Sequence, residues 1–434
     1  MPSNHRNLQE FLESVCLEIK YKGVHKDISK ELADHIEDQK AKYIERGLEE
    51  EDAVIKAIEE MGDPAVIGRQ LNDAHKPKTE WSILAIMGIL VGISAWLQYF
   101  MSGIATGEDR MLRFITYVPV GILVFLVVYF FDYSLLRRYA RIIYVLLFGI
   151  TAFGLSVLPM TNGTYSHMYY AALLFIPVFG GVVYSIKGKN IWGIFLAGAF
   201  YIPVALLFFK ASAFTSLLFF STACLIIMST AISKGFYSCT KRQALTAIFI
   251  PTFLISILYI RYIPPYVRDR IIHMFNPELD SGGSGYLMLT IQKLVSSAQA
   301  FGPATLGDNF IGINIHQILP NWSTDFLLTY ITARFGYVPA ALMVTLLLFL
   351  VVRMFMLVFK QQNPYGFLIS LSVCITIAGQ ILFYVLSNFG ILMPVSFILP
   401  LISYGAYGFV INMGLLGLLL SVYRRMNLIP SNAK

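Results

Sequence analysis

The sequence predicts an all-α protein that crosses a membrane about ten times, with a small helical domain ahead of the first span. Hydrophobic residues make up 56% of the 434 residues and charged residues only 14%, and the mean hydropathy is +0.65. This composition excludes an ordinary soluble protein. The 33 Lys and Arg outnumber the 26 Asp and Glu. They lie mostly in short segments between apolar runs, which favours a role in membrane orientation over nucleic-acid binding.

Residues 1–77 are predicted to form a separate cytoplasmic helical domain. Apolar residues recur every three or four positions within 8–19 and 28–43, and two shorter helices are expected within 50–71. The pattern ELADHIEDQKAKYIERGLEEEDAVIKAIEEMGDPAVIGRQL resembles the helical prefix found ahead of many bacterial permeases. That resemblance implies an accessory domain, for which we favour a regulatory or partner-binding role over solubilisation alone.

Residues 78–434 are predicted to form the membrane domain. A helix that rises about 1.5 Å per residue needs about 20 apolar residues to cross a hydrocarbon core of about 30 Å. The apolar runs that meet this length lie near 82–101, 115–131, 142–160, 168–186, 191–209, 213–232, 245–263, 327–352, 366–386 and 400–422.

The basic residues of the membrane domain predict its orientation. Those that fall at one end of the expected spans are Arg137, Arg138, Arg141, Lys187, Lys189, Lys234, Lys241, Arg242, Lys360, Arg424 and Arg425. Arg110, Arg113 and Lys210 fall at the other end but are outnumbered. The positive-inside rule therefore predicts that both termini are cytoplasmic and that the large loop 264–324 lies outside.

Polar chemistry concentrates in this outside loop and just after it. Asp325, in LPNWSTDFLLTY, is either a helix cap, the more frequent role at such a position, or a carboxylate that takes a proton from a sugar hydroxyl. Arg268 and Arg270 either hold a phosphate or contact lipid headgroups. Arg334 either offsets the charge of a leaving group or extends towards the membrane surface.

The four cysteines form no CxxC pair and have no His at metal-ligand spacing, which predicts no metal site.

Several motifs in the second half of the chain resemble those of the SEDS family, the shape, elongation, division and sporulation proteins. LPNWSTDF is similar to the LPEAHTDF-type element of that family, and LISYG at 401–405, preceded by Leu399-Pro400, to its LPLISYGGS signature. RDRIIHMFNPELDSGGSGYL resembles the segment that opens the family's long outer loop, and GQILF and GILMPVSFILP fit neighbouring positions.

The resemblance implies a ten-span peptidoglycan glycosyltransferase of the bacterial cytoplasmic membrane, which polymerises lipid II at the outer face during division, elongation or sporulation. It implies that Asp325 is the catalytic base. The implied substrate is linked to undecaprenyl diphosphate. No cofactor is assigned, and a divalent cation is left open. The implied partners are a class B penicillin-binding protein and membrane lipids. The substrate-binding residues expected on this basis are Arg268, Arg270, Arg334, Lys210, Gln317 and Ser403.

The chain also departs from the family pattern. Ser323 replaces the His of the HTD element, and Ala333-Arg334 replace a Glu pair that precedes a glycine. Gln317 stands at an acidic or polar position, and KASAFT, which begins at Lys210, lacks an expected carboxylate. These departures keep two alternatives open: a catalytically inactive SEDS-like scaffold or regulator of cell-wall synthesis, and a flippase for lipid-linked precursors.

Overall fold

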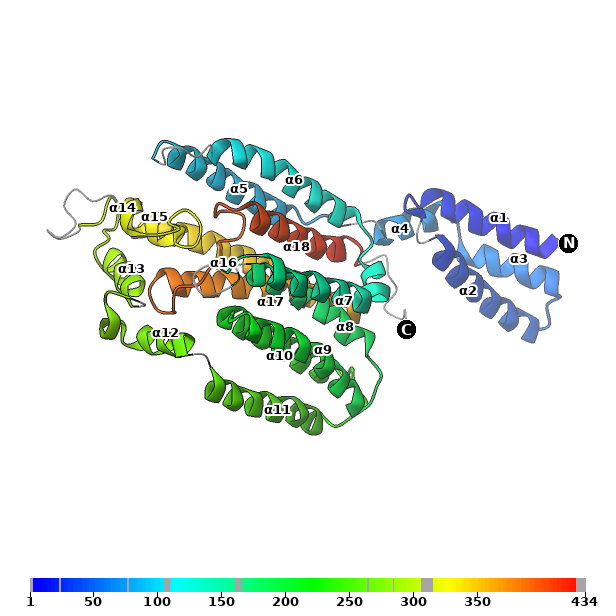
Figure 1. Ribbon diagram of the computed structural model, residues 1–434. Coiled ribbons are helices and arrows are strands. Elements are labelled where there is room, and N and C mark those ends of the chain that lie inside the picture. Colours follow the sequence, from blue (N-terminus) through cyan, green and yellow to red (C-terminus); the bar gives the residue numbers. More distant parts are fainter. Residues whose placement is uncertain are drawn as a thin grey trace. The chain divides into compact units, whose positions relative to one another are not determined.

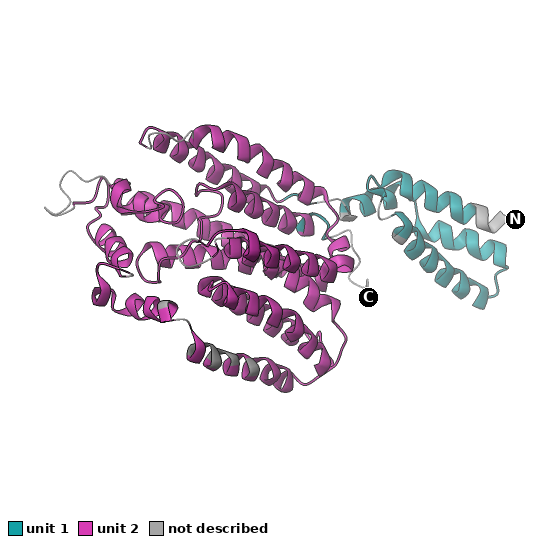
Figure 2. Ribbon diagram, viewed as in Figure 1, with its two compact units in different colours: residues 1–79, 423–434 teal, residues 80–422 magenta. Residues whose placement is uncertain are grey.

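The computed structural model is helical, and among the residues that it describes there is no β-strand (Figure 1). The chain folds into two compact units, residues 1–79 with 423–434 and residues 80–422 (Figure 2). Residues 76–77, at the end of the expected cytoplasmic domain, and 306–314, in the middle of the expected outside loop, lie outside the described residues. The described residues are 3–22, 25–75, 78–104, 110–160, 165, 167–263, 265–283, 285–305 and 315–426.

The amino-terminal unit contains the four expected helices. They are α1 (Ser3–Glu18), α2 (His25–Glu45), α3 (Glu50–Met61) and α4 (Pro64–His75). Their apolar faces meet in one core, in which Phe11, Val15 and Ile36 are buried. Asp63 caps the start of α4, because its carboxylate accepts a hydrogen bond from the Ala65 N–H at 2.9 Å.

Nine helices of the second unit, counted among the described residues, are long and apolar enough to cross a membrane. They are α5 (Trp81–Ser102), α6 (Arg110–Phe130), α7 (Ser134–Val157), α8 (His167–Ser185), α9 (Ile191–Lys210), α10 (Phe214–Ser233), α16 (Tyr337–Lys360), α17 (Pro364–Asn388) and α18 (Ala406–Arg424). The span expected at 245–263 falls on α11 (Lys241–Tyr262), where several side chains lie outside the described set. The protein is thus a multi-pass membrane protein.

Helices α8 and α17 form the centre of the membrane unit. They are the most buried of the nine helices, with 78% and 72% of their apolar windows inside the protein. Small residues let α8 approach its neighbours closely: a Cβ on Gly180 would lie 2.2 Å from Ser372 Oγ of α17, and one on Gly181 would lie 3.1 Å from Ala140 of α7. Small residues at helix interfaces are typical of membrane bundles.

The eighth span differs from its predicted bounds. The run 327–352 was expected to be one helix, but it is divided into α15 (Leu327–Phe335) and α16 (Tyr337–Lys360). Gly336 separates them with φ +102°, and a Cβ at this position would lie 2.5 Å from the Ala300 carbonyl oxygen. Only glycine accepts this conformation and this approach without strain. The eighth membrane helix therefore begins at Tyr337, and α15 with Arg334 precedes it.

The two ends of the membrane unit differ in character. At one end lie the short helices α12 (Pro265–Phe275), α13 (Tyr286–Ser296), α14 (Ile315–Ile318) and α15 (Figure 1). We call this the loop end. The other end, where α7 and α17 begin and α16 ends, carries among others Arg137, Arg138, Arg141, Lys187 and Lys360, and we call it the basic end.

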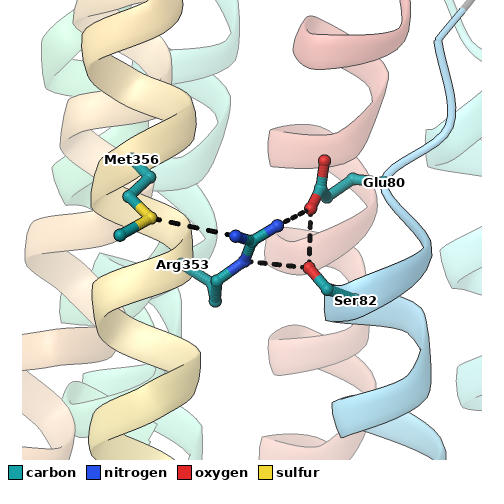
Figure 3. Close-up of polar contacts among 4 residues, drawn as sticks. All are labelled: Glu80, Ser82, Arg353 and Met356. Atoms are coloured by element: carbon teal, nitrogen blue, oxygen red, sulfur yellow. Dashed lines mark hydrogen bonds and ion pairs between the residues drawn. The ribbon is translucent and has the colours of Figure 1, made fainter.

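At the basic end an ion pair joins α5 to α16. Arg353 donates to the Glu80 carboxylate and, at 2.9 Å, to Ser82 Oγ (Figure 3). Burial alone would raise the pKa of Glu80, but the hydrogen bonds from Ser82 and Arg353 outweigh it and the pKa is lowered. The Arg353–Glu80 ion pair therefore links α5 to α16 at the basic end of the bundle.

Candidate functional site

Asp325 lies in a tight turn at the loop end, between α14 and α15. Asn321 has a positive φ of 49°, and its carbonyl oxygen accepts the N–H groups of Thr324 and Phe326 at 3.0 and 3.2 Å. Asparagine tolerates this left-handed conformation better than most residues. The Asn321 side chain also donates to Asp325 Oδ2 at 3.0 Å. The turn thus presents the carboxylate in one defined orientation.

Three buried side chains from other elements hold the backbone of this turn. Tyr384 Oη and Ser403 Oγ both donate to the Thr324 carbonyl oxygen, at 3.2 and 3.0 Å. Asn388, which is 1% exposed, donates from Nδ2 to the Asp325 carbonyl oxygen at 2.9 Å. Buried polar groups that are this fully paired make a segment rigid. The backbone of Asp325 is therefore fixed to α17 and to the segment that precedes α18.

Asn388 also sets the start of α15. Its Oδ1 accepts the Thr329 N–H at 3.0 Å, and its carbonyl oxygen accepts Thr329 Oγ1 at 2.8 Å. The orphan N–H groups of a helix start need such partners. The cap at this start is therefore supplied by a residue of α17, whereas the sequence left Asp325 as a candidate cap. The Asp325 carboxylate does not perform that role here.

The Asp325 carboxylate is half-buried and its pKa is raised. Burial raises the pKa to about 6, and hydrogen bonds from Asn321 and Thr324 offset part of this effect. Tyr169, Tyr170 and Tyr384 lie close enough to interact electrostatically with it. Within the described residues no lysine or arginine forms an ion pair with this carboxylate. A base with this pKa is mostly ionised at neutral pH and still able to accept a proton.

Arg110, at the first residue of α6, is a functional candidate that the sequence reasoning missed. Its side chain is 8% exposed. Its guanidinium carbon lies 5.0 Å from the ring centroid of Trp322 and 5.4 Å from that of Tyr404. Trp322 belongs to the turn of Asp325, and the Tyr404 N–H donates to the Ser323 carbonyl oxygen at 3.3 Å. Arg110 opposes the charge trend of the loops, and this was the available signal.

The structure brings together only some of the residues expected in the site. Ser403 is buried and bonded to the Asp325 turn, as described above. Arg268 and Arg270 are exposed on α12, and Arg334 is exposed in the last turn of α15. Lys210 ends α9, and Gln317 lies on α14, a helix of four residues. Their assignment as substrate-binding residues therefore stays a prediction.

The described residues contain no group of three His, Cys, Asp or Glu side chains arranged to hold a metal ion. His273 and Asp280, at the loop end, lie 3.9 Å apart as a pair. The polar chemistry of the site is thus carried by a carboxylate, a guanidinium, amides and hydroxyls.

A family model places the chain among known proteins. The model of the FtsW, RodA and SpoVE proteins, described as "Cell cycle protein", matches residues 75–428. The chain belongs to this family. The matched range contains the whole membrane unit and begins close to the end of α4. The expected resemblance to the SEDS family is thereby confirmed.

Curated relatives in the family are named as peptidoglycan glycosyltransferases. The probable peptidoglycan glycosyltransferase FtsW of Idiomarina loihiensis is 28% identical over 224 residues, which cover 51% of this chain and 53% of the relative. The peptidoglycan glycosyltransferase RodA of Treponema pallidum is 30% identical over 175 residues, which cover 39% of each chain. The chain thus spans about half, or less, of the length of these relatives.

Solved structures support the fold over a larger share of the chain. A chain from a study of how a peptidoglycan synthase complex coordinates polymerization and crosslinking has a TM-score of 0.62 at 19% identity, over 80% of this chain and 98% of that one. The rod shape determining protein RodA of Thermus thermophilus has a TM-score of 0.52 at 16% identity, over 80% of this chain and 97% of that one. At these identities the likeness concerns the fold alone.

Proposed function

We propose that the protein is a peptidoglycan glycosyltransferase that polymerises a lipid-linked disaccharide, lipid II, at the outer face of the bacterial cytoplasmic membrane. The observation that carries the proposal is Asp325: a half-buried carboxylate of pKa about 6 on a backbone fixed by buried partners. The family membership and the names of the relatives support it.

In this reaction Asp325 acts as the general base. Its carboxylate takes the proton of a sugar hydroxyl on the acceptor, and the hydroxyl oxygen bonds to the anomeric carbon of the donor sugar. The bond from that carbon to the diphosphate oxygen breaks, and the bonding electrons leave with the polyprenyl diphosphate. A guanidinium near the departing oxygens stabilises the growing charge. Arg110 is the cation built closest into this turn, and Arg268, Arg270, Arg334 and Lys210 are further candidates at the loop end.

The orientation and partner follow from the same proposal. With the basic end in the cytoplasm, both termini are cytoplasmic and Asp325 faces the outside, in line with the positive-inside rule. A class B penicillin-binding protein is the proposed partner. The likeness in fold to a chain of a complex that couples polymerization to crosslinking supports it.

The test is polymerisation of lipid II by the purified protein, with the proposed partner present, in wild type and in Asp325→Asn. We expect the rate to fall by about 10²- to 10⁴-fold, the usual contribution of a general base. Asp269→Asn is the matched control, because Asp269 is an exposed carboxylate on α12 of the same loop region. Equal rates in wild type and Asp325→Asn would remove Asp325 from the mechanism.

A second candidate function is a membrane scaffold that has kept the fold without catalysis. It is favoured by the residues at the Glu pair of the family pattern, where Ala333 is fully buried and Arg334 is exposed. The site therefore has one carboxylate where the family pattern has more. A wild-type protein that makes no glycan strands, yet binds the transpeptidase partner, would establish this function instead.

A further inference from the structure

An apolar cavity lies between α6, α7, α8, α17 and α18. Its volume is about 510 Å³, within the range of about 300–1,000 Å³ that is usual for ligand sites. Its lining is almost wholly aliphatic and includes Val127, Ala140, Pro177, Ile369 and Leu415. Apart from the hydroxyl of Tyr365, such a lining has no group to recognise a polar molecule. It fits a hydrocarbon chain.

The cavity reaches the basic end, although Val410 and Ile411 near the start of α18 also line it. Its wall contains Leu136 from the first turn of α7 and Tyr365 from the first turn of α17. Both helices begin at the basic end. A chain that occupied the cavity would therefore have its headgroup among the cations of that end, on the side opposite the proposed catalytic turn.

An arginine stands at this mouth of the cavity. Arg137 follows the lining residue Leu136, and its guanidinium carbon lies 5.1 Å from the ring centroid of Tyr184. The rings of Tyr184 and Tyr365 are 4.9 Å apart, and Arg137 is close enough to Tyr365 to interact with it electrostatically. Lys187 approaches the ring of Tyr184 as well, at 5.7 Å. Two cations are thus ordered by aromatic rings at one point of the membrane surface.

The hydroxyl of Tyr365 is an independent sign of a polar ligand. The side chain lines the cavity and is only 3% exposed. Its hydroxyl has no hydrogen-bond partner within the described part of the chain. Buried hydroxyls are nearly always paired, so this one calls for an acceptor that a bound molecule would supply. A phosphate oxygen beside Arg137 meets that need.

We propose that the cavity is a binding site for an anionic phospholipid of the leaflet at the basic end. One acyl chain fills the cavity, and the phosphate is held by Arg137 and the Tyr365 hydroxyl. Charge complementarity selects the occupant, because two cations flank the mouth and basic pockets between membrane helices on this side bind anionic headgroups. This site is separate from the proposed glycosyltransferase site and does not depend on it.

The test is native mass spectrometry of the full chain released from bilayers of equimolar phosphatidylglycerol and phosphatidylcholine. We expect wild type to retain one phosphatidylglycerol in preference to phosphatidylcholine. Arg137→Gln should lower this preference about fivefold, since one basic residue near the surface contributes about that factor. Tyr365→Phe should lower it to a smaller extent.

Arg138→Gln is the matched control. Arg138 is also exposed, and its replacement by Gln changes the net charge by the same amount. Its guanidinium carbon, however, lies 5.6 Å from the ring centroid of Tyr139. It should leave lipid retention unchanged. A Gly414→Leu variant places a side chain in the cavity, where only Val124 lies within 4 Å of the new Cβ, and should reduce the retention of phosphatidylglycerol.

Three results would overturn the proposal. The first is equal retention of the two lipids by wild type. The second is an equal loss in Arg138→Gln and Arg137→Gln, which would indicate a diffuse charge effect. The third is displacement of phosphatidylglycerol by undecaprenyl diphosphate added at the same concentration, which would assign the cavity to a polyprenyl lipid.

Discussion

Two parts of the segment between α11 and α16 are held in very different ways. The turn of Asp325 is bonded through its backbone to Tyr384, Asn388 and Ser403, all buried. The helix α12, with Arg268 and Arg270, presents these side chains to the exterior. Both regions were expected to contribute to one site, yet only the first is built into the bundle.

The difference indicates that the proposed reaction needs a precisely positioned base but not precisely positioned cations. A base has to lie within hydrogen-bond reach of one proton, and a displacement of about 1 Å can lower a rate about 10²-fold. A cation that attracts a diphosphate acts over a longer range and tolerates a mobile side chain. We therefore expect changes at the turn to have large effects and changes on α12 to have small ones.

The largest effect is expected from Asn388→Ala. This change leaves the Asp325 carbonyl oxygen and the Thr329 N–H unpaired in a buried place, and each unpaired group costs about 1–3 kcal/mol. Thermal unfolding in detergent should show a marked loss of stability, with loss of polymerisation. Asn363→Ala is the control, because Asn363 caps the other end of α17 and its loss should cost about 1 kcal/mol. A stability loss no larger than that of the control would contradict the role given to Asn388.

A smaller but still large effect is expected from Asp325→Glu. The carboxylate is kept but displaced by one methylene, so the turnover rate should fall about 10²-fold while stability changes little. Steady-state kinetics of lipid II polymerisation would measure this. Full activity would show that the position of the carboxylate is not critical. It would contradict the inference that the turn must be held more precisely than α12.

The double change Arg268→Gln and Arg270→Gln should have a modest effect. If these residues attract the diphosphate from the surface, KM should rise about tenfold or less, with kcat nearly unchanged, because exposed charges interact weakly through water. The rise should shrink at high salt. A collapse of kcat would instead place α12 at the reacting atoms.

The smallest effect concerns the pH profile. With a pKa of about 6 for Asp325, kcat/KM should rise with pH as the carboxylate loses its proton and should level off above that value. Asn321→Ala removes a hydrogen bond that lowers this pKa, so the midpoint should move to higher pH. A midpoint that does not move would mean that another group controls the profile.

Much of the fold follows from patterns that are local in the chain. Apolar runs located the membrane helices, and three-to-four spacing located α1 and α2. The shorter helices α3 and α4 were expected within 50–71. The division at Gly336 was missed because residues 327–352 read as one apolar helix. The reason for the break lies far along the chain, where the backbone at Ala300 approaches Gly336.

Only part of the site could be predicted, because the contacts that build it also join residues far apart in the sequence. Asp325 and Ser403 were found through motifs. Their connection runs through the Thr324 carbonyl oxygen, and Asn388 joins Asp325 across 63 positions of sequence. The spacing of apolar residues along the chain does not predict which distant residues form such hydrogen bonds. Arg110 is likewise far from Trp322 and Tyr404 in the sequence. It becomes a functional candidate only because the structure places its guanidinium over both rings.

The partial exposure of Asp325 has a consequence for the living cell. In the orientation proposed above, this carboxylate titrates with the medium that bathes the wall and is shielded from cytoplasmic buffering. Acidification of the surroundings to about pH 6 would protonate about half of these groups. On the proposed mechanism, mildly acid surroundings would then slow the reaction through Asp325 itself.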